Sequence, residues 1–347
     1  GSDKGYLDAH KENGNMYQEL LYQKGGSVME KKIKIWLLIA ISLVLIGCIL
    51  FVGVMSMLEW DFTKLSTTKY ETNTYEVSDA FDGISIDTTT ADIVFVLSDN
   101  GKCRVECHEE EKAKNSVTVE EGILNIKLVY ERAGYFGLNI GSPKITVYLP
   151  KTEYTSLLID ESTGDIEIPK DFSFNNVDIS LSTGEVNFNA SASEMIKIKT
   201  STGDIRVENI SAGTLDLSVS TGKVTVSSVT CEGDITVGVS IGKAYLTDIA
   251  CKNVISSGST GDISLDNVIA AKKFYIERST GDVRFENSDA TEIFVETGTG
   301  YVTGTLLTDK VFIIQTDTGN VDVPKSVDGS RCEIITDTGD IKITIKQ

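Results

Sequence analysis

Proline and histidine are both scarce in this sequence, with four and two residues in 347. Apolar residues make up 41% of the chain, so it can bury a sizeable core in one or two domains, and this composition argues against disorder. The shortage of histidine bears on catalysis, because a serine or threonine nucleophile needs a nearby base. His10 lies near the N-terminus and His108 lies outside the repeats described below. The repeated Ser-Thr-Gly-Asp motif therefore has no base to activate it.

Basic residues are also in the minority, since 32 Lys and Arg stand against 51 Asp and Glu and give a net charge of −19. The excess falls in residues 59–347, which carry −20. An acidic body argues against nucleic acid as a partner. It favours solubility, or affinity for cations or basic surfaces.

Charge is absent altogether from residues 35–58, a run of 24 residues. At 1.5 Å per residue a helix of this length measures about 36 Å, enough to span a bilayer core of roughly 30 Å. Three lysines precede the run and two acidic residues follow it. The positive-inside rule then predicts a single-pass transmembrane anchor, with the N-terminus in the cytoplasm and the C-terminal domain extracellular.

Two other interpretations of this segment stay open. Leu45-Ile46-Gly47-Cys48 matches the lipobox of bacterial lipoproteins, which makes Cys48 a candidate for lipidation, although the apolar run continues after it. A conventional cleaved signal peptide is the other alternative. All three interpretations export the body of the protein.

The first 28 residues have neither apolar periodicity nor basic character. They end in Lys24-Gly25-Gly26 shortly before Met29, and this tripeptide is what a purine-rich ribosome-binding site encodes when it is translated. We therefore expect residues 1–28 to be translated leader or an added cloning segment. Met29 would be the natural start, and residues 29–34 a short cytoplasmic tail.

A repeat dominates the C-terminal part of the chain. Copies such as STGDIRV at 201–207 recur with a spacing of 19 or 20 residues. A period this regular is typical of a solenoid in which each turn is one repeat. We expect a glycine at one corner of each turn, at Gly164, Gly184, Gly203, Gly222, Gly242, Gly261, Gly281, Gly300, Gly319 and Gly339.

Apolar residues recur in steps of two on both sides of each glycine, at offsets −7 and −5 and again at +2 and +4. Steps of two indicate β-strands, and the inward phase changes at the glycine and once more at +5 and +6. Each change of phase requires a corner, where glycine supplies the positive φ. We therefore predict three short faces per turn and an all-β, parallel β-helix of about ten turns, right-handed and roughly 50 Å long.

Residues 59–150 are expected to form a linker and an irregular β cap, followed by the regular β-solenoid in 151–347. The pattern of the repeat begins before its first regular glycine. In ISIDTTTADIVF, Ala91 takes the place of the glycine, and Ile84 and Phe95 lie at the inward offsets. The interval before Gly164 holds longer strands and charged loops. At the other end we expect the solenoid to stop at the strand of residues 341–345.

The order of these parts resembles a known family. An anchor is followed by an ISID…ADI strand pair, a G-x-L-x-I strand, a strand ending in Leu149-Pro150, and serial STGDI turns. This order is similar to the bacterial "putative adhesin" family of membrane-anchored β-solenoid domains, a domain of unknown function, and the likeness covers about residues 70–347. The resemblance implies the fold and a cell-surface location, and it brings no catalytic, cofactor or metal-binding residues.

The repeat suggests three kinds of chemistry. The threonine before most of the glycines is expected to form a hydroxyl ladder between turns. A serial calcium site is disfavoured because Lys223 and Lys243 interrupt the row of acidic residues that follow the glycines. Asp262 and Asp282 lie one turn apart like the carboxylates of a glycan-cleaving β-helix, but turns of nearly constant length leave little room for a cleft.

Cys231 and Cys251 occupy the same offset in adjacent turns. Their Cα atoms should lie near 4.8 Å apart, within reach of a disulfide. Alanine occupies the same offset in other turns, so a stack of buried thiols is the favoured interpretation over a bridge.

The leading hypothesis is a non-enzymatic cell-envelope protein of a Gram-positive type that displays an acidic β-solenoid outward as an adhesin or binding scaffold. Its partners would be the membrane, through residues 35–58, and a wall polymer, a host surface or another envelope protein. The alternatives are an accessory in envelope-stress sensing that acts through a membrane partner and, third, a carbohydrate-active β-helix enzyme. No cofactor is expected.

Overall fold

The computed structural model describes residues 34–60, 69–130 and 142–346, so the expected leader and most of the expected tail lie outside the described residues. The chain forms two units, which are considered separately. The described part of the first unit contains the helix Lys34–Met57, whose 24 residues have a mean hydropathy of 3.1 in their most apolar window. A helix satisfies its backbone groups internally, as a bilayer demands. Length and composition thus suffice for a membrane crossing.

The second unit is built of β-strands and begins with a cap that contains antiparallel pairs. β1 pairs antiparallel with β4, β4 with β7, and β5 with β6. β2 and β3 pair in parallel with β6 and β7. The bounds are β1 (Tyr70–Val77), β2 (Gly83–Thr90), β3 (Asp92–Leu97), β4 (Cys103–Glu110), β5 (Ala113–Glu120), β6 (Ile123–Tyr130) and β7 (Lys144–Leu149).

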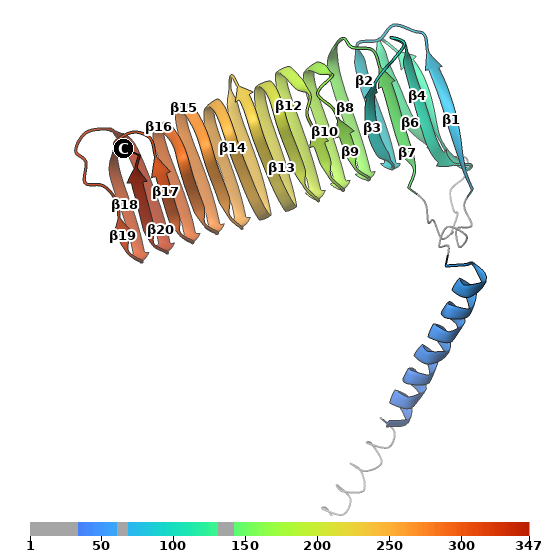
Figure 1. The fold of residues 1–347 in the computed structure, drawn as a ribbon, viewed down its shortest axis with the longest axis horizontal. Helices are drawn as coiled ribbons and strands as arrows, with labels where there is room; N and C mark the ends of the chain where they lie inside the picture. Colours follow the sequence, from blue (N-terminus) through green and yellow to red (C-terminus); the bar gives the residue numbers. More distant parts are fainter. Residues whose placement is uncertain (1–33, 61–68, 131–141, 347) are drawn as a thin grey trace, which may run out of the picture. The chain divides into compact units, whose positions relative to one another are not determined.

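The following strands stack in parallel and form the solenoid expected from the repeat (Figure 1). Several strands continue around a corner and are therefore long. Their bounds are β8 (Glu153–Thr163), β9 (Ile166–Ile168), β10 (Ser173–Thr183), β11 (Val186–Phe188), β12 (Ser191–Thr202), β13 (Ile205–Cys231), β14 (Asp234–Thr260), β15 (Ile263–Thr280), β16 (Val283–Thr299) and β17 (Val302–Leu306). The last four are β18 (Lys310–Thr318), β19 (Val321–Asp322), β20 (Ser330–Thr338) and β21 (Ile341–Ile345).

Each regular turn has three faces, as the two changes of phase predict. The turn around Gly203 illustrates them, since the glycine has a φ of 135° and Asn209, six residues later, has a φ of 57°. The third corner lies where the register shifts between Ala192 and Met195. The second corner has a positive φ at Ser228, Asp248, Asn267 and Asn287 as well. Short polar side chains tolerate this conformation, because they can bond to the nearby backbone.

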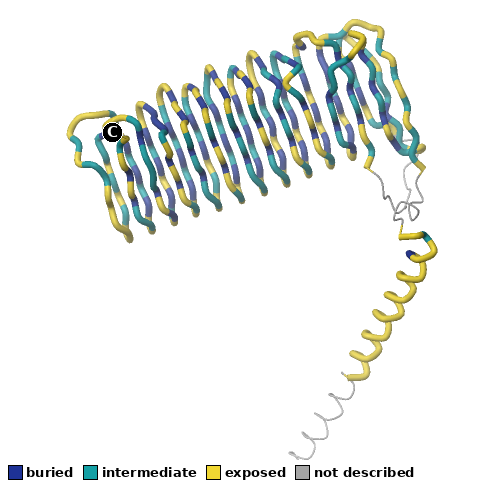
Figure 2. Tube along the Cα trace, in the orientation of Figure 1, coloured by how far each residue is buried: buried dark blue, intermediate teal, exposed yellow. Residues whose placement is uncertain are grey.

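The core is a continuous column of apolar side chains. Buried residues alternate with more exposed ones along the strands (Figure 2). Successive turns contribute equivalent residues, such as Ile179, Ile198 and Leu217, which are buried and paired across neighbouring strands. Burying each such side chain contributes roughly 1.5–3 kcal/mol relative to leaving it in water. The stack of apolar rows therefore holds the turns together.

The order of turns in space differs from their order in sequence at both ends. In the cap, Ile84 of β2 lies between Leu124 of β6 and Leu157 of β8. At the far end, Cys332 of β20 lies between Ile293 of β16 and Phe312 of β18. The turn of β20 and β21 is therefore the penultimate one, and the turn of β18 and β19 is the outermost.

The expectation that the solenoid stops at residues 341–345 is therefore wrong. A chain-terminal strand at the end of the stack would leave one row of backbone donors and acceptors unpaired. Because β20 and β21 are inserted between two other turns, both of their edges are hydrogen-bonded. The open edge belongs instead to β18 and β19, and the chain continues from this turn into β17 on one side and β20 on the other.

Candidate functional site

The residue after each corner glycine joins neighbouring turns. Asp204 Oδ1 accepts a hydrogen bond from the backbone N–H of Lys223 in the next turn, at 2.8 Å. The same bond to the equivalent N–H of the next turn is made by Asp92, Asp165, Asp262, Asp282 and Asp340. These aspartates thus bridge adjacent turns at the corner, where the chain bends out of the regular strand ladder. The recurrence of Asp in the motif has a structural reason.

Lysine substitutes for aspartate where it can pair with one. Lys223 Nζ lies 3.1 Å from Asp204 Oδ2, and Lys243 Nζ lies 2.9 Å from Asp262 Oδ2. Among the residues that the structure describes, no group of three His, Cys, Asp or Glu is placed to hold a metal ion. The row is a set of bonds between turns in which the lysines offset the acidic charge.

Asp262 and Asp282 also bond one turn to the next. Asp262 accepts the N–H of Asp282 at 3.1 Å through one oxygen and the ammonium of Lys243 through the other. The hydrogen bond from Lys243 lowers the pKa of Asp262. A general acid in glycan cleavage needs a raised pKa instead, so Asp262 is unsuited to that role.

Threonine hydroxyls do join turns, but at a different offset from the expected one. Thr297 and Thr336, three residues before their glycines, donate through Oγ1 to the carbonyls of Gly281 and Gly300 at 3.0 and 3.3 Å. The threonine next to the glycine is exposed and uses its backbone instead; the carbonyl of Thr221, for example, accepts the N–H of Gly203 at 3.0 Å. The motif therefore serves the scaffold at several positions.

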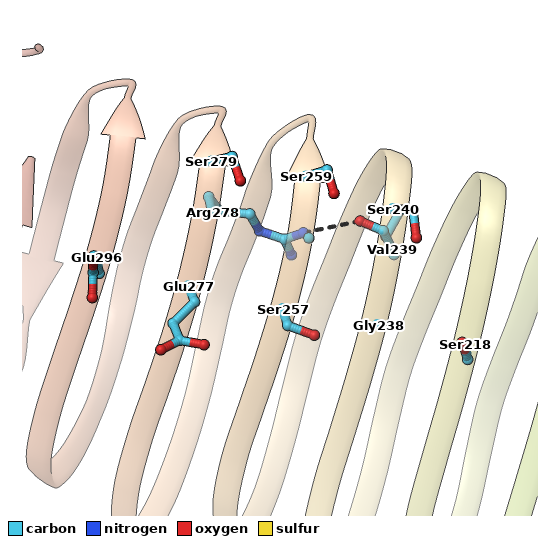
Figure 3. A pocket seen from close by; sticks show the side chains of 11 residues that line it. Ser218, Gly238, Val239, Ser240, Ser257, Ser259, Glu277, Arg278, Ser279 and Glu296 are labelled. Carbon is cyan, nitrogen blue, oxygen red and sulfur yellow. Dashed lines mark hydrogen bonds between the residues drawn. The ribbon is translucent and has the colours of Figure 1, made fainter. Parts of the chain in front are cut away.

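A groove of about 500 Å³ lies across the face formed by β13, β14, β15 and β16 (Figure 3). We call it the serine groove. Its lining is rich in hydroxyls and small residues and includes one arginine and two glutamates: Ser218, Gly238, Val239, Ser240, Ser257, Gly258, Ser259, Glu277, Arg278, Ser279 and Glu296.

Arg278 lies along the solenoid and crosses a whole turn within the groove (Figure 3). Its Nη1 donates to the carbonyl of Val239, two turns away, at 3.4 Å, and its Nη2 donates to Ser256 Oγ at 2.8 Å. The path exists because Gly258 has no side chain, since a Cβ there would come within 1.7 Å of Nη1. The corresponding positions of most turns hold aliphatic residues or threonine, such as Leu181.

Arg278 is only 4% exposed, and its Nε has no hydrogen-bond partner among the described residues. Burial lowers the pKa of the guanidinium to about 10, which still leaves it charged at neutral pH. A buried charge without a paired carboxylate is unusual in a protein interior. Arg278 lines the groove, and each of its Nη atoms carries a second N–H beyond the one that it donates to Val239 or Ser256.

Two aromatic rings flank the groove on the outward side of the same strands. Tyr275 of β15 and Phe294 of β16 are stacked with centroids 5.0 Å apart and planes 15° apart. The ammonium of Lys273 lies 4.6 Å from the centre of the Tyr275 ring, and the Tyr275 hydroxyl donates to Glu277 in the groove wall. That hydrogen bond raises the pKa of Tyr275, so the hydroxyl stays protonated.

Comparison with known proteins gives the family. The model of the Toastrack DUF4097 family matches residues 81–238 and 232–347. The chain belongs to the Toastrack DUF4097 family. No curated protein is similar enough to count as a relative.

Several solved structures are similar to this Toastrack chain. A "putative adhesin" from Bacteroides fragilis is 15% identical, with a TM-score of 0.39, and the likeness covers 80% of this chain and 97% of that one. A "putative adhesin" from Parabacteroides merdae is 11% identical, with a TM-score of 0.43, over 80% and 96%. A "putative lipid binding protein" from Parabacteroides distasonis is 17% identical, with a TM-score of 0.43, over 69% and 95%.

The Toastrack structure places most of the corner glycines in a conformation that other residues avoid. The φ angle lies between 127° and 153° at Gly164, Gly184, Gly203, Gly222, Gly242, Gly261, Gly281 and Gly339. At Gly300 and Gly319 the constraint is spatial, since a Cβ there would lie 2.0 and 2.1 Å from a carbonyl oxygen of the adjacent turn. All ten glycines lie at close approaches between turns.

The cysteines of the Toastrack chain are free thiols in the structure. Cys231 and Cys251 are buried, and Cys231 Sγ lies 3.4 Å from the carbonyl oxygen of Gly213. Burial raises the pKa of the Cys251 thiol to about 12. Cys48, the lipidation candidate, is exposed on the apolar helix.

No outward residue stands out in the sequence alone, so the serine groove was not predicted. Two signals were present. Ser256 breaks the aliphatic row at offset −5, and the structure pairs it with Arg278. Ile255, Tyr275 and Phe294 also follow each other at offset −6 in successive turns, where most of the other turns hold charged residues or threonine. The departures from the Toastrack repeat mark the site better than the repeat itself.

Proposed function

We propose that the protein is a membrane-anchored, non-enzymatic binding protein that displays its acidic β-solenoid outside the cell. The apolar helix and the lysines that precede it support a single-pass topology with the N-terminus inside. In this topology residues 29–34 face the cytoplasm, residues 35–58 cross the membrane, and residues 59–150 lead into the regular solenoid of 151–347.

The serine groove is the observation that carries the proposal. The recurring aspartates and lysines bond one turn to the next, so they form no catalytic set. The groove, in contrast, offers hydroxyls, carboxylates and a buried guanidinium that are not part of the recurring bonds between turns. A concave site with a few fixed polar groups beside apolar surface is typical of ligand binding.

The test uses the full chain in detergent micelles or lipid nanodiscs. We expect it to co-sediment with isolated wall polymer or to bind host surface material without shortening the polymer. Depolymerisation would favour the enzyme alternative and contradict the proposal. Copurification of a membrane kinase or transporter, lost when residues 35–58 are exchanged for another helix, would favour the accessory role in envelope-stress sensing instead.

Topology is tested separately in intact cells. We expect external protease to digest the β-unit, while a tag placed directly before Met29 stays protected until the membrane is opened. Protection of the β-unit would contradict the display of the solenoid outside the cell.

A further inference from the structure

We propose that the serine groove, together with the stacked rings of Tyr275 and Phe294, is a binding site for a neutral polysaccharide made of gluco-configured sugars. This inference rests on the proposed function and names the class of ligand. We call the whole site, groove and rings together, the glycan site.

The outward side chains of the face form rows across successive turns. The register places Ile255 beside Tyr275 and Tyr275 beside Phe294, all three half-buried. The next row, two residues further along each strand, places Ser257 beside Glu277 and Glu277 beside Glu296. An apolar row therefore runs parallel to a polar row along the solenoid.

This pairing matches the two surfaces of a sugar. A pyranose with equatorial hydroxyls carries C–H groups on both ring faces, and these pack against aromatic rings as apolar surface. Its rim carries hydroxyls that both donate and accept. The rings of Tyr275 and Phe294 stack on each other, so their outer edges, together with Ile255 beside Tyr275, form the apolar platform. The polar row provides partners for the rim.

The polar groups of the groove include both hydrogen-bond donors and hydrogen-bond acceptors. Glu277 and Glu296 accept, serine hydroxyls do both, and Arg278 donates. A hydroxyl of a neutral sugar can use all three kinds of group. An anionic ligand would meet the two glutamates and a body of net charge −20, which disfavour it.

Arg278 distinguishes this site from an ordinary polar surface. Arg278 is 4% exposed, and its Nε–H has no hydrogen-bond partner among the described residues. The guanidinium is held by Val239 and Ser256, so it is positioned before a ligand arrives. A preorganised donor costs little entropy on binding.

The direction in which the polysaccharide would bind follows from the spacing of the turns. Strands of a parallel sheet lie about 4.8 Å apart, which is close to the advance of one sugar unit in an extended polysaccharide. A saccharide that runs along the solenoid thus meets equivalent groups in successive turns. We expect affinity to increase with the length of the saccharide up to the five successive turns that the groove crosses, two of them in β14.

The experiment titrates cellohexaose, chitohexaose and hexaglucuronate into the full chain in nanodiscs, followed by calorimetry. We expect the two neutral hexamers to bind and the charged hexamer to bind at least roughly tenfold more weakly. Tighter binding of hexaglucuronate would overturn the proposal in favour of an anion site at Arg278. A preference for chitohexaose over cellohexaose would point to the wall glycan as the natural source.

Two variants test the residues. Phe294→Thr keeps a β-forming residue and removes half of the platform, and we expect binding roughly tenfold weaker. Ile313→Thr is the matched control, since Ile313 is 46% exposed at the same offset in β18, outside the groove. Equal effects of the two substitutions would overturn the assignment of the platform.

Arg278→Met is the second test variant. It replaces the buried charge by an apolar side chain of similar length, and Ser256 keeps its bond to the carbonyl of Val237 at 3.0 Å. We expect a folded protein, an unchanged or higher melting temperature, and loss of binding to the neutral hexamers. Full binding by this variant would show that the arginine is structural and would overturn its role in the site.

The outcomes separate this inference from the proposed function. If the wild type co-sediments with wall polymer, yet neither hexamer competes and Phe294→Thr changes nothing, the glycan site is wrong and the proposed binding function stands. If the wild type binds no wall or host material at all, the proposed function fails first.

Discussion

Glycine at the corners is required by space as well as by φ. A Cβ at Gly203 would lie 1.9 Å from the carbonyl oxygen of Gly184, and φ there is 135°. We expect Gly203→Ala to lower the free energy of unfolding by about 3 kcal/mol or more, because the adjacent backbone must move. Urea denaturation followed by circular dichroism measures the change.

Gly238 provides the control for this substitution. A Cβ at Gly238 meets no atom closer than 3.6 Å, which is ordinary contact. We expect Gly238→Ala to change the free energy of unfolding by less than about 1 kcal/mol in either direction. If both substitutions cost the same, the close approach at the corner is not what selects glycine.

Glu161 makes stability depend on pH near the cap. It is 2% exposed, and Oε1 accepts the N–H groups of Ala91 and Thr163 at 3.2 and 3.3 Å. Burial raises the pKa of Glu161 to about 7, above the value of 4.5 for a free glutamate. The folded state therefore binds a proton more tightly than the unfolded state, so this group's contribution falls as pH rises from 4.5 to 7.

Glu161→Gln isolates this effect, because the amide is neutral at every pH and keeps an oxygen acceptor. We expect the melting temperature of the variant to exceed that of the wild type at pH 8, and the difference to shrink at pH 5. Thermal unfolding of both proteins at the two pH values measures it. A difference that stays constant would mean that Glu161 is ionised throughout.

The thiols of Cys231 and Cys251 should be protected by burial. Their pKa values are raised chiefly by desolvation, which keeps them protonated and slow to react. We expect neither to be alkylated in the native protein and both to be alkylated after unfolding without reductant, as mass spectrometry of the peptides would show. A disulfide between them would leave both unlabelled in the unfolded chain.

At the scale of single residues, the sequence predicted the positions that repeat and missed those that do not. Inward offsets and corner glycines follow from a period counted over ten copies. Arg278 occurs once, and its position depends on Gly258 and Ser256 in the preceding turn. A single departure from a repeat acquires meaning only when the neighbouring turns are placed beside it.

The outer turn of the solenoid is held by a buried ion pair between strands. Lys310, at the start of β18, is 1% exposed and contacts Asp289 of β16. Its ammonium also donates to the carbonyl of Ala290 at 2.9 Å and to Ser330 of β20 at 2.8 Å. Three strands that are distant in sequence thus meet at one side chain.

We expect Lys310→Met to destabilise the C-terminal turns by about 3 kcal/mol, because it leaves the carboxylate of Asp289 buried without its cation. Hydrogen exchange should then lose protection in β18 and β20 while β10 to β13 stay protected, since turns of a solenoid contact only their neighbours. Lys342→Met is the control, because its pair with Asp322 is exposed and 4.0 Å long.

A double substitution keeps this prediction testable if the single variant unfolds. Asp289→Asn combined with Lys310→Met removes both charges, and we expect it to recover part of the loss. No recovery would mean that Lys310 acts through its neutral contacts alone.

At the scale of elements, the sequence predicted strands and turns but not the order in which they stack. The turns of β18 and β20 carry the same apolar offsets, so the pattern assigns each to a turn and says nothing about its neighbour. The order shows in pairings such as Ile293 of β16 with Cys332 of β20, which bypass the turn of β18 that lies between them in sequence. The repeat period therefore does not predict that a turn is inserted between two others at each end of the solenoid.

The whole β-unit carries a large excess of negative charge on turns that lie close together. Residues 59–347 carry −20, and adjacent strands are about 4.8 Å apart. Salt shortens the screening length from about 10 Å at 0.1 M to about 3 Å at 1 M. We therefore expect the melting temperature to rise with sodium chloride, because self-repulsion in the folded state is relieved.

Calcium should act only through the same screening. The aspartates that follow the corner glycines already accept backbone N–H groups, and Lys223 and Lys243 interrupt their row. In the described ranges, no three Asp, Glu, His or Cys side chains lie together so that they could hold a metal ion. Melting curves in calcium chloride and in sodium chloride at matched ionic strength should therefore coincide. A saturable rise with calcium at micromolar or low millimolar concentration would contradict this, and would mean that the acidic ladder binds the ion in preference to the adjacent turn.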